Sequence, residues 1–161
     1  MADIYILRQF PEQHRSFSGK PASMLTGLSA NIEMPVQEDL DKLAPEKTII
    51  EIEDTMAEVK SGIDESKELA RTENTAPTFA RAGQSTQLVV GASQSNDGVI
   101  LTKAEALYKK FQLRRVYYSA FSPAQFTDPE LAKDPTPPMR EHRLYEADWL
   151  IRHYGFAAHE M

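Results

Sequence analysis

The chain has 161 residues, enough for one domain with a sizeable hydrophobic core, and its composition (41% hydrophobic, 26% charged) is that of a soluble globular protein. It contains no cysteine, which excludes disulfides, thiolate nucleophiles and cysteine-ligated zinc or iron–sulfur sites within the chain. The net charge of −6 argues against nucleic-acid binding by the chain as a whole.

The first predicted elements are short. Residues 4–7 favour a short strand. Residues 28–34 favour a second strand, which the proline at position 35 ends, and strand alternation places Asn31 and Glu33 on the same face. Residues 36–43 are predicted to form a short helix that ends before an Ala-Pro pair.

A long helix is predicted from residue 49 to about Arg71. Its apolar residues follow helical spacing and form one stripe, at Ile49, Ile52, Met56, Val59 and Ile63. Acidic side chains dominate the other faces. Residues 36–75 hold twelve acidic against five basic side chains, and so carry a net charge of −7.

Residues 84–121 indicate one β-α-β unit. An apolar run at 86–90 favours a strand, and a second strand follows at 114–121. The helix between them is indicated by Leu101, Ala104, Leu107, Tyr108 and Phe111. Two strands joined in this way pair in parallel through a right-handed crossover. Ligands in such folds bind at the carboxyl ends of the strands, so 91–93 and 119–122 are predicted to line one mouth.

A local basic strip runs from this helix into the second strand. Lys103, Lys109, Lys110, Arg114 and Arg115 outnumber Glu105 there, which gives a local charge of +4. The strip fits an exposed helix end, where cations complement the helix dipole. Local contact with phosphate is the alternative.

The last part of the chain begins with a proline-rich stretch, residues 122–138. This stretch is too long for an ordinary connection and is predicted to be a functional loop or an ordered excursion over the mouth. A final helix is predicted at 139–154, ended by Gly155. Its predicted apolar face holds Leu144, Ala147, Ile151 and Tyr154.

The order of elements predicts an α/β fold with a parallel sheet. Three strands leave two unpaired edges and poorly covered faces, which are typical of part of a larger structure. We therefore expect an incomplete (β/α) barrel half, with parallel strands and helices on the outside. Residues 27–161 form this expected barrel-like domain, and residues 1–26 remain an unassigned N-terminal segment.

Several collinear stretches resemble one group of radical S-adenosylmethionine proteins, described as putative DNA modification or repair proteins with a helix-hairpin-helix segment. The resemblance covers residues 27–161, in order and with similar spacing. The matching stretches are LSANIEMP (28–35), LAPEK (43–47), IDESKE (63–68), FARAGQSTQLVVGAS (79–93), LRRVYYSAFSP (113–123) and REHRLYEADWLIRHYGF (140–156).

The resemblance implies a partial (β/α) barrel that binds S-adenosylmethionine and, in intact relatives, a [4Fe–4S] cluster held by a CxxxCxxC loop. This chain has neither that loop nor the helix-hairpin-helix segment, so the chain alone is not expected to be an active enzyme. It corresponds to the C-terminal barrel part of such a protein. The alternatives are a non-catalytic adenosyl- or nucleotide-binding module, a subunit that completes its barrel with another chain, and a truncated gene product.

The same resemblance predicts cofactor-binding residues. Asn31 and Glu33 would lie near the ribose and methionine parts of S-adenosylmethionine. The strand carrying Gln87, Gly91 and Ser93 would approach the adenine, and Ser119 would follow on the next strand. These predicted site residues are Asn31, Glu33, Gln87, Gly91, Ser93 and Ser119.

The residues themselves leave other roles open for these positions. Asn31 and Glu33 also fit an exposed strand face. Gln87 also fits the start of a strand, where hydrogen bonds to the backbone would satisfy its side chain. Gly91 also fits a turn. The aromatic residues of the second strand, Tyr117, Tyr118 and Phe121, fit core packing or stacking on a base.

The final helix carries the remaining polar candidates. Arg140 and Arg143 fit either a phosphate contact or ion pairs within the helix, for example with Glu146. The four histidines follow no metal-binding spacing, so no metal site is predicted.

No signal peptide or membrane span is evident, which favours a cytoplasmic location and no membrane partner. Nucleic acid remains a partner through the parts of the family architecture that this chain lacks. Open sheet edges predict self-association.

Overall fold

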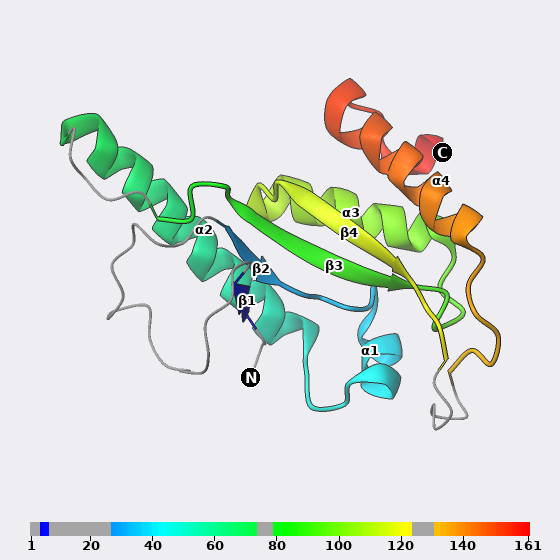
Figure 1. Ribbon diagram of the computed structural model, residues 1–161. Helices are drawn as coiled ribbons and strands as arrows, with labels where there is room; N and C mark the ends of the chain where they lie inside the picture. Colours follow the sequence, from blue (N-terminus) through cyan, green and yellow to red (C-terminus); the bar gives the residue numbers. More distant parts are fainter. Residues whose placement is uncertain (1–3, 7–26, 74–78, 124–130) are drawn as a thin grey trace.

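The computed structural model describes residues 4–6, 27–73, 79–123 and 131–161 (Figure 1). The strands are β1 (Ile4–Ile6), β2 (Leu28–Ala30), β3 (Gln84–Val90) and β4 (Arg115–Ala120). The helices are α1 (Gln37–Leu43), α2 (Ile49–Thr72), α3 (Asp97–Phe111) and α4 (Pro138–Trp149), followed by a π-helical turn (Leu150–Tyr154) and a 3₁₀ turn (Ala158–Glu160).

One sheet organises the fold, in the order β1-β2-β3-β4. Strands β2, β3 and β4 are parallel, as predicted, and β3 pairs with β4 from Ser85↔Arg115 to Val90↔Ala120. The first strand pairs antiparallel with β2 and covers 4–6 of the predicted 4–7. The prediction of an α/β fold with a parallel sheet is confirmed, with an antiparallel edge strand added.

Helices α2 and α3 cover the same face of this sheet. The side-chain amide of Gln84 in β3 donates to the carbonyls of Met56 in α2 (3.0 Å) and Phe111 in α3 (3.1 Å). One side chain can reach both helices only if they lie on the same side of the sheet. Alternate strand residues point to this face. They form the core with the helices and are almost fully buried: Leu28, Ala30, Leu88, Val90, Val116 and Tyr118.

The predicted strand at 28–34 is interrupted. β2 ends at Ala30 because the hydroxyl of Thr86 enters the ladder, donating to Ala30 O (2.7 Å) and accepting from Ile32 N (3.0 Å). Pairing resumes at Glu33, whose N–H donates to Gln87 O at 2.9 Å and whose φ is +62°. A buried side chain thus replaces one step of backbone pairing.

Both long helices begin at capping residues. Thr48 accepts from Glu51 N before α2, and Asn96 accepts from Val99 N before α3. The predicted stripe of α2 is confirmed, since Ile52, Met56 and Val59 are buried, and the helix extends to Thr72, one residue beyond Arg71.

The final helix differs from the prediction at its C-terminal end. The α-helix stops at Trp149, and a π-helical turn then leads to Gly155, which ends it with φ +75° as predicted. A π turn rotates later residues relative to an α-helix. Tyr154 is therefore 68% exposed rather than on the apolar face. The buried residues of the last helix and its π turn are Leu144, Asp148 and Ile151.

Glu53 joins α2 to α3. Its carboxylate pairs with Lys103 Nζ at 2.7 Å and with Lys110 Nζ at 2.6 Å. Burial raises the pKa of this carboxyl, but the two lysines lower it by more, so the pKa lies below its ordinary value. Such a group stabilises the fold above its unfolded-state pKa and loses that contribution as the pH falls through its folded-state pKa.

We expect acidification to destabilise the wild-type chain more than the Glu53→Gln variant, which has no carboxyl to protonate at this position. The difference should not exceed about 1 kcal/mol, because Lys110 is largely exposed. Urea unfolding at about pH 7 and about pH 3.5 measures it. Glu58→Gln, an exposed change on the same helix, is the control. Equal acid sensitivity in wild type and Glu53→Gln would contradict this role.

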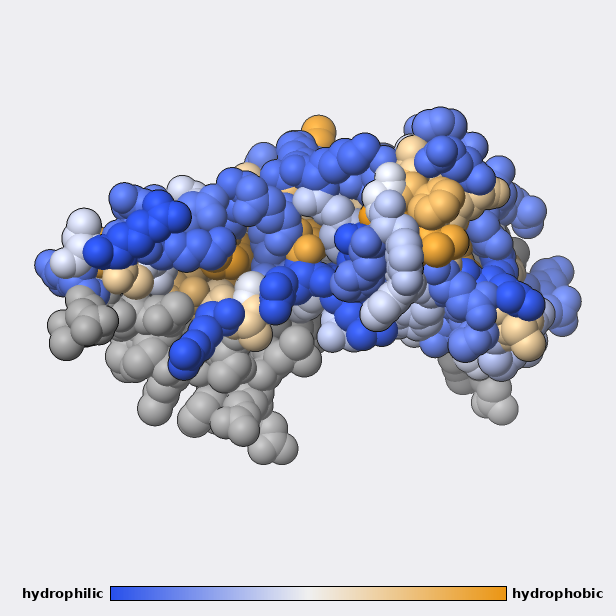
Figure 2. Space-filling model, turned by 90° about the horizontal axis from the view of Figure 1, so that it is seen from above, coloured by the Kyte–Doolittle hydropathy of each residue, from blue (hydrophilic) through white to orange (hydrophobic). Residues whose placement is uncertain are grey.

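No helix in the described part of the chain is long and apolar enough to cross a membrane. In Figure 2 the visible surface is mainly hydrophilic, and its largest hydrophobic patch lies toward the α4 end of the molecule, with smaller ones elsewhere.

Candidate functional site

The candidate site lies on the sheet face opposite α2 and α3, which we call the polar face. Strand alternation places on it the residues that do not point into the core. They are Ser29 and Asn31 at β2, Ser85, Gln87 and Val89 in β3, and Arg115, Tyr117 and Ser119 in β4. Three of the six predicted site residues, Asn31, Gln87 and Ser119, therefore share one surface.

Asn31, Gln87 and Tyr117 form a row across the three parallel strands. Gln87 is the register partner of Tyr117. Asn31 lies between the Ser29↔Ser85 pair and the bridge from Glu33 to Leu88, and so beside Gln87. Neighbouring strands lie about 4.8 Å apart, so the row is about 10 Å long. Tyr117 is 41% exposed and the two amides are partly exposed, which leaves the row accessible.

The row keeps unused hydrogen-bonding capacity. Asn31 Oδ1 accepts from Ser29 Oγ at 2.7 Å, while its amide nitrogen finds no partner among the described residues. In the same part of the chain the side chains of Gln87 and Ser119 form no hydrogen bond. Two amides and a hydroxyl can therefore donate to or accept from a ligand.

A cation lies at one end of the row. The Arg115 guanidinium carbon is 5.2 Å from the centre of the Tyr117 ring and 5.2 Å from that of Tyr145. Arg115 is exposed and forms no ion pair with any described residue. Contact with the ring face holds the arginine beside the row.

Glu33 occupies the carboxyl end of β2, just beyond the row. Its carboxylate lies 4.0 Å from Lys47 Nζ, and both side chains are largely buried. The positive φ of Glu33 turns its side chain out of the regular strand alternation. Glu33 therefore lies next to the row through its backbone, and its side chain pairs with Lys47.

Gly91 lies at the mouth, but a side chain of the same chain fills the space beside it. A Cβ at this position would stand 2.0 Å from Thr136 Oγ1, and φ is +82°. Thr136 donates through its hydroxyl to Val90 O (2.8 Å) and through its N–H to Phe121 O (2.8 Å). Thr136 thus occupies the space beside Gly91 in this structure.

The described part of the proline-rich stretch runs over the mouth. This agrees with one of the two predictions for it, an ordered excursion over the mouth. Besides Thr136, Ala132 N donates to Ala92 O at 3.0 Å. We call residues 131–137 the strap, because they tie the carboxyl ends of β3 and β4 together. The rest of the predicted loop, 124–130, lies outside the described residues.

Ser93 is held inside the structure. Its hydroxyl donates to Asp39 Oδ2 at 2.6 Å and accepts from Ser95 N at 3.2 Å. Ser95 donates to the same carboxylate oxygen at 2.5 Å. These bonds attach α1 to the loop after β3, so both described hydrogen bonds of the Ser93 hydroxyl lie within the chain.

The sequence analysis missed a buried cluster around Asp148. This carboxylate is fully buried and accepts from Tyr108 (2.6 Å), Tyr118 (3.1 Å) and Arg152 (2.6 Å). Burial, together with the Asp148 carboxylate, raises the pKa of Tyr108 and Tyr118 well above the usual range, so both hydroxyls stay protonated donors. The sequence signal that points to it is the i, i+4 spacing of Asp148 and Arg152 in the predicted helix.

The remaining sequence candidates form internal contacts. Tyr118 packs in the core and Phe121 is partly buried. Both arginines that we considered for phosphate have an acidic partner at 2.7 Å, Arg140 with Asp97 and Arg143 with Glu146. Arg152 pairs with Asp148 at 2.6 Å. In the basic strip, Lys103 and Lys110 pair with Glu53, and Lys109 with Glu105.

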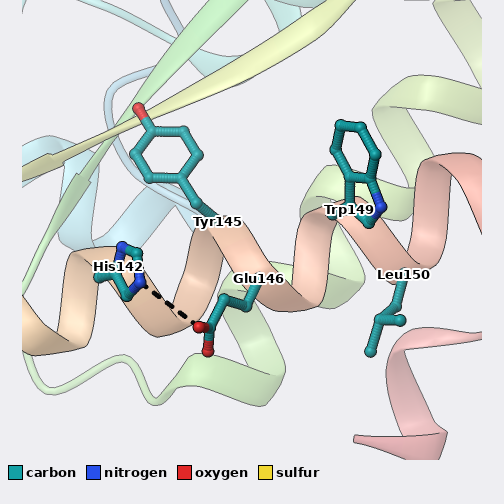
Figure 3. Close-up of a pocket in the computed structure, with 5 residues that line it drawn as sticks. All are labelled: His142, Tyr145, Glu146, Trp149 and Leu150. Carbon is teal, nitrogen blue, oxygen red and sulfur yellow. Dashed lines mark ion pairs between the residues drawn. The ribbon is translucent and has the colours of Figure 1, made fainter.

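A shallow apolar pocket lies on the outer side of α4 (Figure 3). It is lined by His142, Tyr145, Glu146, Trp149 and Leu150, and His142 pairs with Glu146 at 3.3 Å. The described residues contain no group of three or more His, Cys, Asp or Glu side chains that could hold a metal ion.

Comparison of this chain with models of protein families, with curated proteins and with solved structures found no match.

Proposed function

We propose that the polar face binds an adenosyl group, and that this chain is the adenosyl-binding half of a (β/α) barrel of the radical S-adenosylmethionine type. The observation that carries the proposal is the row of Asn31, Gln87 and Tyr117, in which two amides lie beside an exposed aromatic ring on neighbouring parallel strands.

The chemistry of the row suits a nucleoside. A purine presents ring nitrogens and an exocyclic amine at its edge, for which amide side chains supply matching acceptors and donors. Its flat face stacks on an aromatic ring such as that of Tyr117. The row is about as long as a nucleoside, since two strand spacings cover about 10 Å.

The residues of this chain do not fit an iron–sulfur cluster. Such clusters are held by cysteine thiolates, and the chain contains none. In this proposal the chain binds and orients the adenosyl group through its amides and Tyr117, and radical chemistry, if it occurs, depends on a cluster held by another polypeptide segment. The chain alone then acts as a binding module.

A barrel half has a second requirement, which is a partner for the sheet face on which neither α2 nor α3 packs. Parallel sheets are normally covered on both sides, whereas α2 and α3 both pack on one side of this sheet. The alternative from the sequence, a subunit that completes its barrel with another chain, is favoured by this asymmetry.

Calorimetric titration with S-adenosylhomocysteine, a stable adenosyl ligand, tests the proposal. We expect binding with a Kd in the micromolar range, on the order of 10 μM. Gln87→Ala should weaken it about tenfold through the lost hydrogen bond, and Tyr117→Ala about tenfold or more through the lost stacking.

Two exposed residues outside the polar face give matched controls. Gln94→Ala, in the loop after β3, and Tyr154→Ala, in the last helical turn, should leave the affinity unchanged. Absence of binding heat on a folded wild-type sample would remove the proposal. Binding that Gln87→Ala and Tyr117→Ala leave intact would place the ligand elsewhere.

A further inference from the structure

Arg115 is held by aromatic rings rather than by an anion. Its guanidinium lies against the Tyr117 ring of β4 and the Tyr145 ring of α4, with 5.2 Å from the guanidinium carbon to each ring centre. Within the described part of the chain this side chain forms neither an ion pair nor a hydrogen bond. Contact with a ring face leaves the N–H donors, which lie in the guanidinium plane, available. Arg115 is therefore a positive charge whose donors are unused.

The two rings that hold Arg115 are themselves fixed. The Tyr145 hydroxyl accepts from Tyr118 N at 2.9 Å and donates to Tyr118 O at 3.0 Å. Figure 3 shows this hydroxyl end of Tyr145 reaching the sheet. Tyr117 belongs to the ladder between β3 and β4, opposite Gln87. A guanidinium that is positioned in advance loses less conformational freedom when it binds an anion.

Among its described residues the polar face carries this positive charge and no negative one. Its other side chains are hydroxyls, amides, one valine and one tyrosine. The carboxylate of Glu33, at the end of β2, is turned out of the strand alternation and lies 4.0 Å from Lys47 Nζ. The chain as a whole has a net charge of −6. A cation on a face without carboxylates therefore favours an anionic ligand at this place.

The position of Arg115 indicates where the anionic group of a ligand would lie. Arg115 and Tyr117 are two residues apart in β4, so both side chains point to the polar face. Two residues of a strand span about 6.6 Å. A ribose covers a distance of this order between a base and its 5′-phosphate. A base stacked on Tyr117 beside Gln87 can thus bring its 5′-phosphate to Arg115.

We propose that the ligand of the polar face is an adenine nucleotide, whose 5′-phosphate is bound by Arg115. This inference rests on the adenosyl site proposed above and names the chemical class of its ligand. A phosphomonoester carries a charge of about −1.5 to −2 at pH 7 and offers three acceptor oxygens to the fork of the guanidinium.

The charges of the polar face favour a nucleotide over an adenosyl amino acid. The amino-acid part of S-adenosylhomocysteine carries an ammonium beside its carboxylate. Arg115 can pair with the carboxylate, but the described residues of this face supply no carboxylate for the ammonium. A phosphate has no such second charge to satisfy.

Calorimetric titration of the wild-type chain with three ligands tests the inference. They are adenosine, adenosine 5′-monophosphate (AMP) and S-adenosylhomocysteine. We expect AMP to bind at least about tenfold more tightly than adenosine, through charge-assisted hydrogen bonds to Arg115. Adenosine and S-adenosylhomocysteine should agree within about threefold. The advantage of AMP should shrink as the NaCl concentration rises, because salt screens an exposed charge pair.

Two neighbouring arginines provide a variant and its matched control. Arg115→Gln should lower the ratio of AMP affinity to adenosine affinity to about one, because the cation is lost. Arg114→Gln removes the same charge from the adjacent exposed residue. The Arg114 side chain lies beside Gly83, and strand alternation points it away from the polar face, so this variant should keep the wild-type ratio. Circular dichroism checks that both variants are folded.

The three ligands separate this inference from the adenosyl site on which it rests. If adenosine and S-adenosylhomocysteine bind but AMP binds no more tightly than either, the nucleotide inference is overturned and the adenosyl site stands. An AMP advantage that persists in folded Arg115→Gln also overturns the inference. Absence of binding heat with all three ligands on a folded wild-type sample removes both.

Discussion

Replacement of Asp148 with alanine is expected to lower the free energy of unfolding by about 3–5 kcal/mol, because it leaves buried partners of a carboxylate without a bond. Tyr108, Tyr118 and Arg152 all donate to Asp148, which is fully buried. These partners lie on α3, on β4 and in the π-helical turn after α4. Loss of the carboxylate therefore loosens three elements at once. Urea unfolding followed by circular dichroism measures the change.

Two variants define the origin of that loss. Asp148→Asn keeps an acceptor oxygen for the tyrosines, so its cost should be smaller. Asp134→Ala, at an exposed position, should change stability by no more than about 0.5 kcal/mol. If Asp148→Ala were no worse than Asp134→Ala, the buried cluster would not hold these elements together.

The second large effect is expected at Gly91. Gly91→Ala should cost about 3 kcal/mol, because two penalties act together. A residue with a Cβ is strained by about 1–2 kcal/mol at the φ of +82°, and the new methyl group would collide with Thr136 Oγ1. The strap is expected to leave the mouth, and proteolysis within residues 131–137 should become faster than in wild type.

Another glycine separates the two penalties. Gly155 has a similar φ of +75° with nothing within 4 Å of its Cβ position, so Gly155→Ala should show the backbone strain alone. Adding Thr136→Ala to Gly91→Ala removes the colliding hydroxyl, and the double variant should lose less stability than the sum of the single changes. Strict additivity, with equal costs at Gly91 and Gly155, would mean that Thr136 does not occupy this space.

The polar face and the β4 edge lead to different views of how this sheet meets a partner. α2 and α3 leave the polar face uncovered, and its row of Asn31, Gln87 and Tyr117 suits a small flat ligand. The β4 edge, by contrast, has all its outward N–H groups bonded within the chain. The self-association that we predicted through open edges stays a prediction.

The sequence by itself determined the features that depend on local spacing. The stripe of α2, the helix of the β-α-β unit and the glycine that ends the last helix follow from periodicity and backbone preference, which neighbouring residues set. The parallel pairing of the strands followed from the order of the elements. Strand alternation was a poorer guide beyond β2, because the positive φ of Glu33 turns its side chain away from the face that it was predicted to share with Asn31.

Only the tertiary structure decided where polar groups far apart in the chain meet. Thr86 interrupts β2, Thr136 fills the space beside Gly91, and Asp148 accepts hydrogen bonds from Tyr108 and Tyr118. Each of these hydrogen bonds joins residues at least 30 positions apart in the chain. A buried polar group needs a partner but does not specify which one, so its partner depends on how helices and strands pack. For that reason the row and the strap could be recognised only in the folded chain.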